Sequence, residues 1–231
     1  MLHRYGFAVV FCALVAMTPT LAFAQVPPSA AEAQAYQGLH LAAWRGDAAK
    51  IEVLVAAGAA LDARDAHGRT PLQVATYGRQ REVISLLAKT GAKLDLLEND
   101  RYDAVTIASV ADDPQTLSLL LSLGAKAGQT TSRYDGTALI AAAHLGHDEV
   151  VRILIRGGAP LDHVNNLHWT ALIESIVLGD GGLRHQRTLA ALVDAGANTQ
   201  LTDRQGNTPL QLAKARGYEA MVEKLKGAGA R

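Results

Sequence analysis

Hydrophobic residues recur along the chain at helical spacing, in pairs of short segments separated by glycine. In residues 149–155 the apolar positions follow the order i, i+1, i+4 and i+5, which forms one stripe along a helix. Residues 139–143 are also apolar and include three alanines, which allow a neighbouring helix to approach closely, and Gly146 lies between the two segments. Neither helix could bury its stripe alone. The pattern therefore predicts helix pairs whose core is completed by stacked neighbours.

Two markers repeat in fixed phase along the chain. Gly-Ala pairs, the first at Gly58, follow one another at spacings of 33, 33, 34, 38 and 33 residues. A second marker lies upstream of each later pair: Thr70, Asp103, Thr137, Thr170 and Thr208. Thr and Asp are good helix N-caps, and a proline that follows, as in Thr70-Pro71, suits the first helical position. The spacing predicts six units, at residues 36–64, 65–97, 98–130, 131–164, 165–202 and 203–231.

Two segments carry a resemblance to a known family. Residues 65–75, Asp-Ala-His-Gly-Arg-Thr-Pro-Leu-Gln-Val-Ala, are similar to the opening of an ankyrin repeat, and residues 146–159 are similar to its second half. The chain resembles the ankyrin-repeat family from about Glu32 to Arg231. The resemblance implies an all-α solenoid of about six helix-turn-helix units with β-hairpin fingers. It also implies that the protein binds another protein through its concave face.

The sequence departs from the ankyrin pattern at two places. Gly68 and Gly206 match the finger glycine, whereas its position is taken elsewhere by Arg101, Asp135 and His168. Altered turns are therefore expected in those three fingers. The fifth unit is five residues longer, and the excess is expected in a loop over 180–186. Its candidate side chains are Asp180, Arg184 and His185, which could hold an anion or a partner's carboxylate. The same insertion could equally be neutral or partner-specific surface decoration.

The N-terminus has the order of a secretory signal peptide. Arg4 precedes an apolar run over 6–17, and Ala-Phe-Ala ends at residue 24. A membrane anchor would need about 20 continuous apolar residues, so no membrane insertion is expected after cleavage. The chain then divides into a signal peptide (1–24), a flexible leader (25–35) and the repeat domain (36–231). The exported, cysteine-free form resembles periplasmic bacterial ankyrin proteins.

Composition and charge exclude several functions. With 22 basic and 22 acidic residues, the chain has no electrostatic basis for gripping nucleic acid. The single cysteine, Cys12, is lost with the signal peptide, which rules out an internal disulfide and a cysteine-rich zinc site. No catalytic motif of the H-E-x-x-H or G-x-S-x-G type occurs. The sequence therefore predicts a monomer without enzyme activity, cofactor or metal.

Histidine supplies the alternative. Seven histidines follow the leader, and the spacing of His144 with His147 and of His163 with His168 could suit a metal. No acidic or cysteine ligand accompanies them at a metal-binding spacing, so a structural role is favoured. An enzyme or a metal- or anion-binding protein using these histidines and the 180–186 loop stays open as the alternative function. A secreted effector that binds host proteins is a further one.

Aromatic and arginine positions indicate where a partner would bind. In the ankyrin pattern the predicted aromatic and arginine residues fall on outward-pointing positions of the concave face. The apolar stripes between packed helices carry aliphatic residues instead. Tyr, Trp and Arg dominate binding hot spots because they combine large apolar area with hydrogen-bonding groups. A finger aromatic could instead pack on the neighbouring finger. The predicted partner-binding residues are Trp44, Arg45, Arg69, Tyr77, Tyr102, Arg133, Tyr134 and Trp169.

Overall fold

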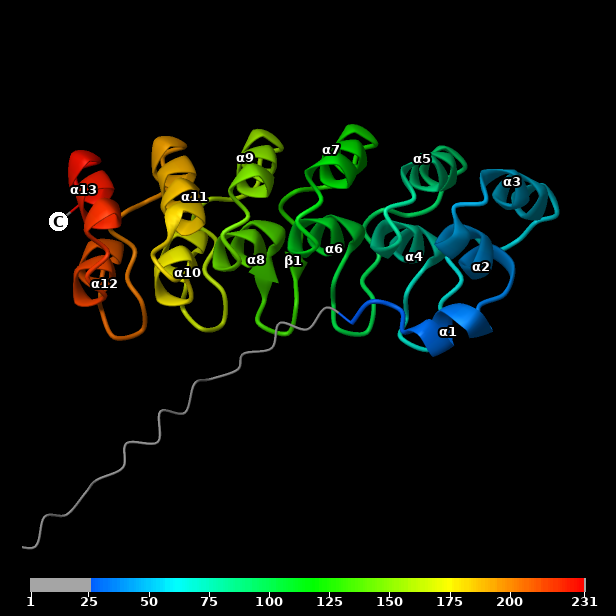
Figure 1. Cartoon of the computed structure of the whole chain (residues 1–231), viewed down its shortest axis with the longest axis horizontal. Helices are drawn as coiled ribbons and strands as arrows, with labels where there is room; N and C mark the ends of the chain where they lie inside the picture. Colours follow the sequence, from blue (N-terminus) through cyan, green and yellow to red (C-terminus); the bar gives the residue numbers. More distant parts are fainter. Residues whose placement is uncertain (1–25, 231) are drawn as a thin grey trace, which may run out of the picture.

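The computed structural model describes residues 26–230, which form one extended stack of helix pairs (Figure 1). One row of helices carries the fingers, and a second row lies along its other side. The predicted signal peptide lies outside the described residues. Within them, no helix is both long and apolar enough to cross a membrane.

Each unit contributes one helix to each row. The inner helices, which adjoin the fingers, are α2 (Gly38–Arg45), α4 (Pro71–Tyr77), α6 (Ala104–Val110), α8 (Ala138–His144), α10 (Ala171–Val177) and α12 (Pro209–Ala215). The outer helices are α3 (Ala48–Ala56), α5 (Arg81–Lys89), α7 (Pro114–Ser122), α9 (Asp148–Arg156), α11 (Leu183–Asp194) and α13 (Glu219–Gly227). Each helix packs on its partner in the unit and on the helices of the same row in adjacent units. The predicted all-α solenoid of six helix pairs is confirmed.

The inner helices begin where the repeated marker predicts. The side chain of Thr70 accepts a hydrogen bond from the backbone N–H of Gln73, whose side chain in turn accepts from the Thr70 N–H. This capping box satisfies two N–H groups that the first helical turn would otherwise leave unpaired. Asp103, the departure from threonine in the third unit, caps α6 by accepting from Thr106 N–H at 2.7 Å. The substitution therefore preserves the start of the helix.

Aliphatic side chains make a continuous core between the two rows. Leu72, Leu139 and Leu172 hold equivalent positions on inner helices and are at most 1% exposed. Leu117 and Leu154 on the outer helices are fully buried against them. Burying such a side chain contributes roughly 1.5–3 kcal/mol. Because every unit repeats this arrangement, stability comes from contacts between neighbours, as the helical pattern predicts.

Each finger is a tight turn organised by one side-chain acceptor. In the second unit Asp65 Oδ1 accepts from the backbone N–H groups of His67 and Arg69, at 2.9 and 2.8 Å. The backbone N–H of Gly68 donates to the Asp65 carbonyl. The equivalent acceptors in the other fingers are Glu98, Ser132, Asn165 and Asp203. Different side chains therefore build the same kind of turn.

The expectation of altered turns is wrong for two of the three fingers that lack glycine. Arg101 and His168 adopt the left-handed conformation of Gly68, with φ of 67° and 69° against 74°. The expectation holds in part for the fourth finger. There Asp135 is left-handed as well, but Ser132 adds a second positive φ of 63°. The strands β1 (Thr130–Thr131) and β2 (Gly136–Thr137) pair antiparallel across that finger.

A glycine at position 168 should stabilise the protein. His168 is exposed, and a left-handed conformation costs an L-residue roughly 1–2 kcal/mol, more than the roughly 0.4–1 kcal/mol by which glycine's freedom favours the unfolded chain. His168→Gly is expected to raise the free energy of unfolding by about 0.5–1 kcal/mol in urea denaturation. The reverse change, Gly206→Ala, meets no neighbouring atom and should lower it by about 1 kcal/mol. A loss of stability in His168→Gly would contradict this account.

Backbone hydrogen bonds join consecutive fingers. The N–H groups of Asn99, Ser132 and Asn166 donate to carbonyls of the preceding finger, each at 2.9 Å. These bonds link the second finger to the third, the third to the fourth and the fourth to the fifth. At the last junction the Arg204 guanidinium donates to the Asn166 carbonyl at 2.8 Å instead. Among the described residues no backbone hydrogen bond joins 165–169 to 203–207.

Two segments differ from the sequence prediction. The flexible leader predicted over 25–35 contains a helix, α1 (Ala30–Ala35), which starts with a capping box between Ser29 and Glu32. The loop predicted over 180–186 is shorter than expected, because residues 183–186 form the first turn of α11. The five extra residues of the fifth unit therefore lengthen an outer helix as well as the turn before it.

Candidate binding surface

The fingers and inner helices form one surface, here called the finger face, which corresponds to the predicted concave face. Of the eight predicted partner-binding residues, Arg45 and Arg133 are exposed there, the latter with 72% of its side chain accessible. The aromatic residues Trp44, Tyr77, Tyr134 and Trp169 are half-buried, with part of each ring accessible. These six residues can contact a partner without rearrangement.

The other two predicted residues are not exposed in this structure. Arg69 is only 1% exposed and Tyr102 only 8%. Arg69 is covered by the segment before the first unit, and Tyr102 lies under the neighbouring finger beside Tyr134. Burial raises the pKa of the Tyr102 hydroxyl, as do the nearby charges of Asp100 and Glu98. Both side chains therefore belong to the interior of the protein and not to its exposed surface.

Tyr102 and Tyr134 line a small hollow that the sequence did not predict. Thr106 of α6 and Ile140 of α8 contribute to its walls, and Glu174 of α10 contributes a buried carboxyl group. Glu174 Oε1 accepts from Asn165 Nδ2 at 2.8 Å, and its Oε2 lies 3.4 Å from His144 Nδ1. Since Asn165 also organises the fifth finger, the carboxyl group of Glu174 fixes that finger against the inner helices.

Ion pairs connect the finger tips. Arg133 Nη2 lies 3.2 Å from Asp100 Oδ1, and Arg101 Nη1 lies 2.9 Å from Asp135 Oδ1. All four side chains are more than a third exposed, so each pair contributes little to stability, typically under about 1 kcal/mol. The same exposure lets a partner's charged groups exchange with them.

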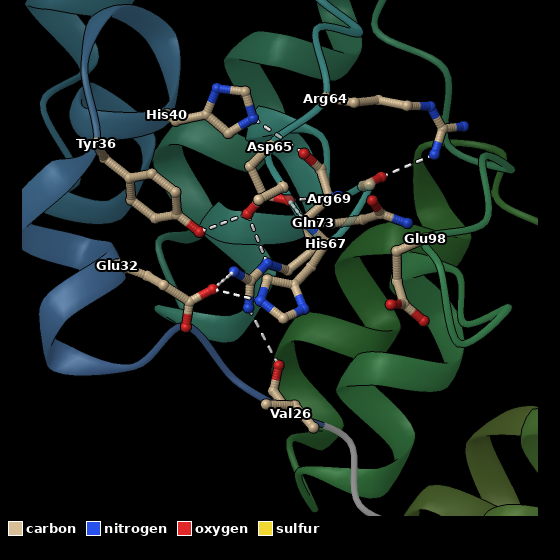
Figure 2. Close-up of polar contacts among 12 residues, drawn as sticks. Val26, Glu32, Tyr36, His40, Arg64, Asp65, His67, Arg69, Gln73 and Glu98 are labelled. Atoms are coloured by element: carbon tan, nitrogen blue, oxygen red, sulfur yellow. Dashed lines mark hydrogen bonds and ion pairs between the residues drawn. The ribbon is translucent and has the colours of Figure 1, made fainter.

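Arg69 is the centre of a buried polar cluster between the second finger and α1 (Figure 2). Its Nε donates to Asp65 Oδ2 at 2.7 Å, and Tyr36 Oη donates to the same oxygen at 2.8 Å. Its Nη2 donates to Glu32 Oε1 at 2.5 Å, and its Nη1 donates to the Val26 carbonyl at 3.2 Å. The guanidinium therefore ties residues 26–36 to the second finger.

The charges of this cluster shift the pKa values of its acids. Hydrogen bonds from Ser29, and then the Arg69 guanidinium, lower the pKa of Glu32 to about 2. Burial opposes ionisation of Asp65, but hydrogen bonds from Arg69 and Tyr36 outweigh it and lower the pKa of Asp65. Both carboxylates are therefore charged near neutral pH. Their ion pairs with Arg69 stabilise the fold above the unfolded-state pKa of Glu32, about 4.5, and this contribution is lost as the pH falls toward 2.

The second candidate site, Asp180, Arg184 and His185, serves mainly to connect units. Arg184 donates to the Gly146 carbonyl at 3.0 Å and to Asp112 Oδ2 at 2.6 Å. His185 Nδ1 lies 2.8 Å from Asp180 Oδ1, and its Nε2 lies 2.9 Å from the His144 carbonyl. Because these contacts already occupy the Arg184 guanidinium and the adjacent His185 imidazole, the two groups do not form an open anion-binding site.

Other histidines also contact backbone carbonyls, in a neighbouring unit for His40 and His147 and within the same unit for His163. His40 Nε2 lies 2.9 Å from the Arg69 carbonyl, His147 Nδ1 lies 2.9 Å from that of Ser109, and His163 Nε2 lies 2.6 Å from that of Asp135. In the described part of the chain, no group of three or more His, Cys, Asp or Glu residues is placed to hold a metal ion. His144 and His147 therefore contact the units on either side of their own, through Glu174 and Ser109.

Comparison with known sequences identifies the repeat. The family model described as ankyrin repeats in three copies matches residues 39–131 and also residues 105–198, together more than half of the chain. The chain belongs to the ankyrin-repeat family. Within that family it is 39% identical, over 100 residues, to the ankyrin repeat protein YahD of Escherichia coli strain K12. That match covers 43% of this chain and spans half the length of the relative.

Solved ankyrin-repeat structures match along most of the solenoid. An ankyrin repeat domain from Acinetobacter baumannii AYE is 41% identical, with a TM-score of 0.79, over 84% of this chain and 98% of that one. The ankyrin repeat domain of Bcl-3, a member of the IκB protein family, is 27% identical, with a TM-score of 0.75, over 85% of this chain and 87% of that one. Ankyrin repeats generally bind other proteins and are typically non-enzymatic.

Proposed function

We propose that this ankyrin-repeat protein is a non-catalytic module that binds a partner protein across its finger face. The observation that carries the proposal is the line of half-buried aromatic rings, Trp44, Tyr77, Tyr134 and Trp169, on the face that bears the exposed Arg45 and Arg133. Rings fixed by their own fold and flanked by arginine bind with little loss of side-chain entropy. The backbone bonds between fingers support the proposal, because they hold the contact residues in place before a partner arrives.

The periplasm is the proposed location. Its support is the order of Arg4, the apolar run over 6–17 and Ala-Phe-Ala before residue 25. The absence of cysteine after that point also suits this location, since the mature chain would neither form nor need disulfides in an oxidising compartment. Partners are therefore sought among periplasmic proteins.

One experiment tests both parts. The protein is purified from the periplasmic fraction, where an N-terminus at Gln25 would support export, and is then used to capture partners from periplasmic extract. Truncating a binding hot spot costs about 2 kcal/mol or more, which is about 30-fold in affinity. Tyr134→Ala and Trp169→Ala are each expected to weaken capture by about this factor. Calorimetry with the purified partner measures the dissociation constant of each variant and of the unmodified protein.

The matched control is Leu183→Ala, which removes an apolar side chain that is 67% exposed on the outer helix α11. Affinity for the partner should be unchanged in this variant. The three variants Tyr134→Ala, Trp169→Ala and Leu183→Ala should all keep the helical circular dichroism signal of the unmodified protein. Equal binding by Tyr134→Ala, Trp169→Ala and the unmodified protein would show that the finger face is not the interface. Full-length protein recovered in the membrane fraction would contradict export.

A further inference from the structure

Residues 26–35, which precede the first unit, form a strap along the fingers of the N-terminal units (Figure 1). Within the strap Pro28 is buried, but no residue of the α1 helix is. Its main attachment is polar: Glu32 and the Val26 carbonyl contact Arg69. A segment that buries so little apolar surface gains little from the hydrophobic effect, so its position depends on these polar contacts.

Two donors of the second finger converge on the strap's carboxylate. Arg69 Nη2 and His67 Nε2 lie 2.5 and 2.8 Å from the same oxygen, Glu32 Oε1 (Figure 2). If the strap left, Arg69 Nη1 and Nη2 would lose their acceptors, while its Nε would keep Asp65. The guanidinium would then stay in position with one edge open. The Nη1 and Nη2 groups of arginine match the two oxygens of a carboxylate, so among common side-chain groups a carboxylate is the preferred ligand of this open edge.

The strap also lies against the predicted binding residues. Ala30, Ala33 and Gln34 share a shallow groove with Trp44 and Arg45 at the N-terminal end of the finger face. Movement of the strap would therefore expose more of the Trp44 ring and open the site on Arg69. Both changes affect the surface on which a partner is proposed to bind.

We propose that Arg69 and His67 form a carboxylate-binding site that the strap occupies through Glu32, and that an acidic segment of the partner displaces the strap. The inference rests on the proposed function for the existence of a partner, and it specifies the chemistry of the partner's contact. A tethered strap competes at an effective concentration on the order of millimolar. The partner outcompetes it by adding contacts to Trp44 and the rings further along the face.

The first test needs no partner. The probe is a peptide of residues 26–36, Val-Pro-Pro-Ser-Ala-Ala-Glu-Ala-Gln-Ala-Tyr, acetylated at its N-terminus and amidated at its C-terminus, so that the Glu32 side chain supplies its one carboxylate. It is titrated into the Glu32→Gln protein, and its binding is followed by NMR signals of the Arg69 and His67 side chains. Binding in the millimolar range is expected, and at least tenfold weaker binding is expected for the peptide that carries Gln at the same position.

Trp44 provides a second readout. The sequence has two tryptophans, so a Trp169→Phe background leaves Trp44 as the single emitter. Glu32→Gln should shift its emission to longer wavelength, because the strap spends more time away from the ring. Glu52→Gln is the matched control, since it makes the same change on an exposed residue of α3 and should leave emission and peptide binding unchanged. Ser29→Ala, which removes the α1 cap without touching Arg69, should shift emission in the same direction.

The outcomes separate this inference from the proposed function. Equal binding of the Glu and Gln peptides would overturn the carboxylate site. So would no binding of either peptide at about 10 mM, or unchanged Trp44 emission in Glu32→Gln. With a captured partner, Glu32→Gln should raise affinity at least threefold, whereas Tyr134→Ala should lower it. A partner that binds Glu32→Gln and unmodified protein equally would overturn displacement of the strap while leaving the finger face as its interface.

Discussion

Replacing Arg69 with alanine is expected to lower the free energy of unfolding by about 3–5 kcal/mol. The side chain is 1% exposed, and its loss leaves Asp65, which is 8% exposed, without its cationic partner. Breaking a buried ion pair by removing one member costs this much, because an uncompensated charge stays in the interior. Without the Arg69 guanidinium, burial opposes ionisation of Asp65, and the folded state bears that desolvation cost. Urea denaturation followed by circular dichroism measures the change.

Arg133→Ala is the matched control for this experiment. It removes the same side chain from the finger face, at a position where 72% of the group is accessible, and should change stability by about 0.5 kcal/mol or less. Because the helices pack mainly on those of neighbouring units, the loss in Arg69→Ala should be concentrated in the first two units. Hydrogen exchange can locate it. Equal, small effects of the two variants would show that Arg69 is exposed, as the sequence alone predicts.

Tyr102→Ala is expected to cost about 3 kcal/mol, whereas Tyr134→Ala should cost about 1 kcal/mol or less. The two tyrosines line the same hollow, but Tyr102 is 8% exposed and Tyr134 is only half-buried. Removing a buried aromatic ring loses its transfer free energy and leaves a cavity, typically about 3–5 kcal/mol for Phe or Trp. Some accessibility at Tyr102 places it at the lower end of that range.

Thermal and urea unfolding of both variants provide the measurement, and Tyr102→Phe is the control for the hydroxyl group. If packing of the ring matters most, Tyr102→Phe should retain most of the stability. A Tyr102→Ala protein that is as stable as the unmodified one, but that does not bind a captured partner, would show that Tyr102 is an exposed binding residue, as the sequence predicted.

The sequence predicted the features that depend on local patterns. Thr70 and Thr208 start helices because their side chains cap N–H groups only three residues away. The fingers follow from an acceptor that reaches the N–H groups two and four residues on. Even at Arg101 and His168, the finger acceptors Glu98 and Asn165 still impose the turn that glycine normally favours. In these helices and fingers, the side chain that accepts the hydrogen bonds and the N–H groups that donate them lie within the same unit of the chain.

The errors concern contacts between distant segments. Arg69 has an outward-facing position in the repeat, but residues 26–35 dock on its guanidinium through Val26 and Glu32. Tyr102 is covered in the same way by parts of the next unit. A local signal for the strap was present, since Ser29 and Glu32 have the spacing of a capping box, but a helix of six residues without an apolar stripe gives no periodic pattern. The sequence predicts residues 183–186 as loop because two glycines precede them, whereas in the structure they begin α11.

The bonds between consecutive fingers give the solenoid an uneven stiffness. Along the finger edge the fingers of the second to fifth units are joined by backbone hydrogen bonds, so that edge resists stretching. At the last junction a single arginine side chain, Arg204, takes the place of the backbone bond. Under tension the fifth and sixth fingers would therefore part before the others, while packing of α12 on α10 and of α13 on α11 still holds the two units together.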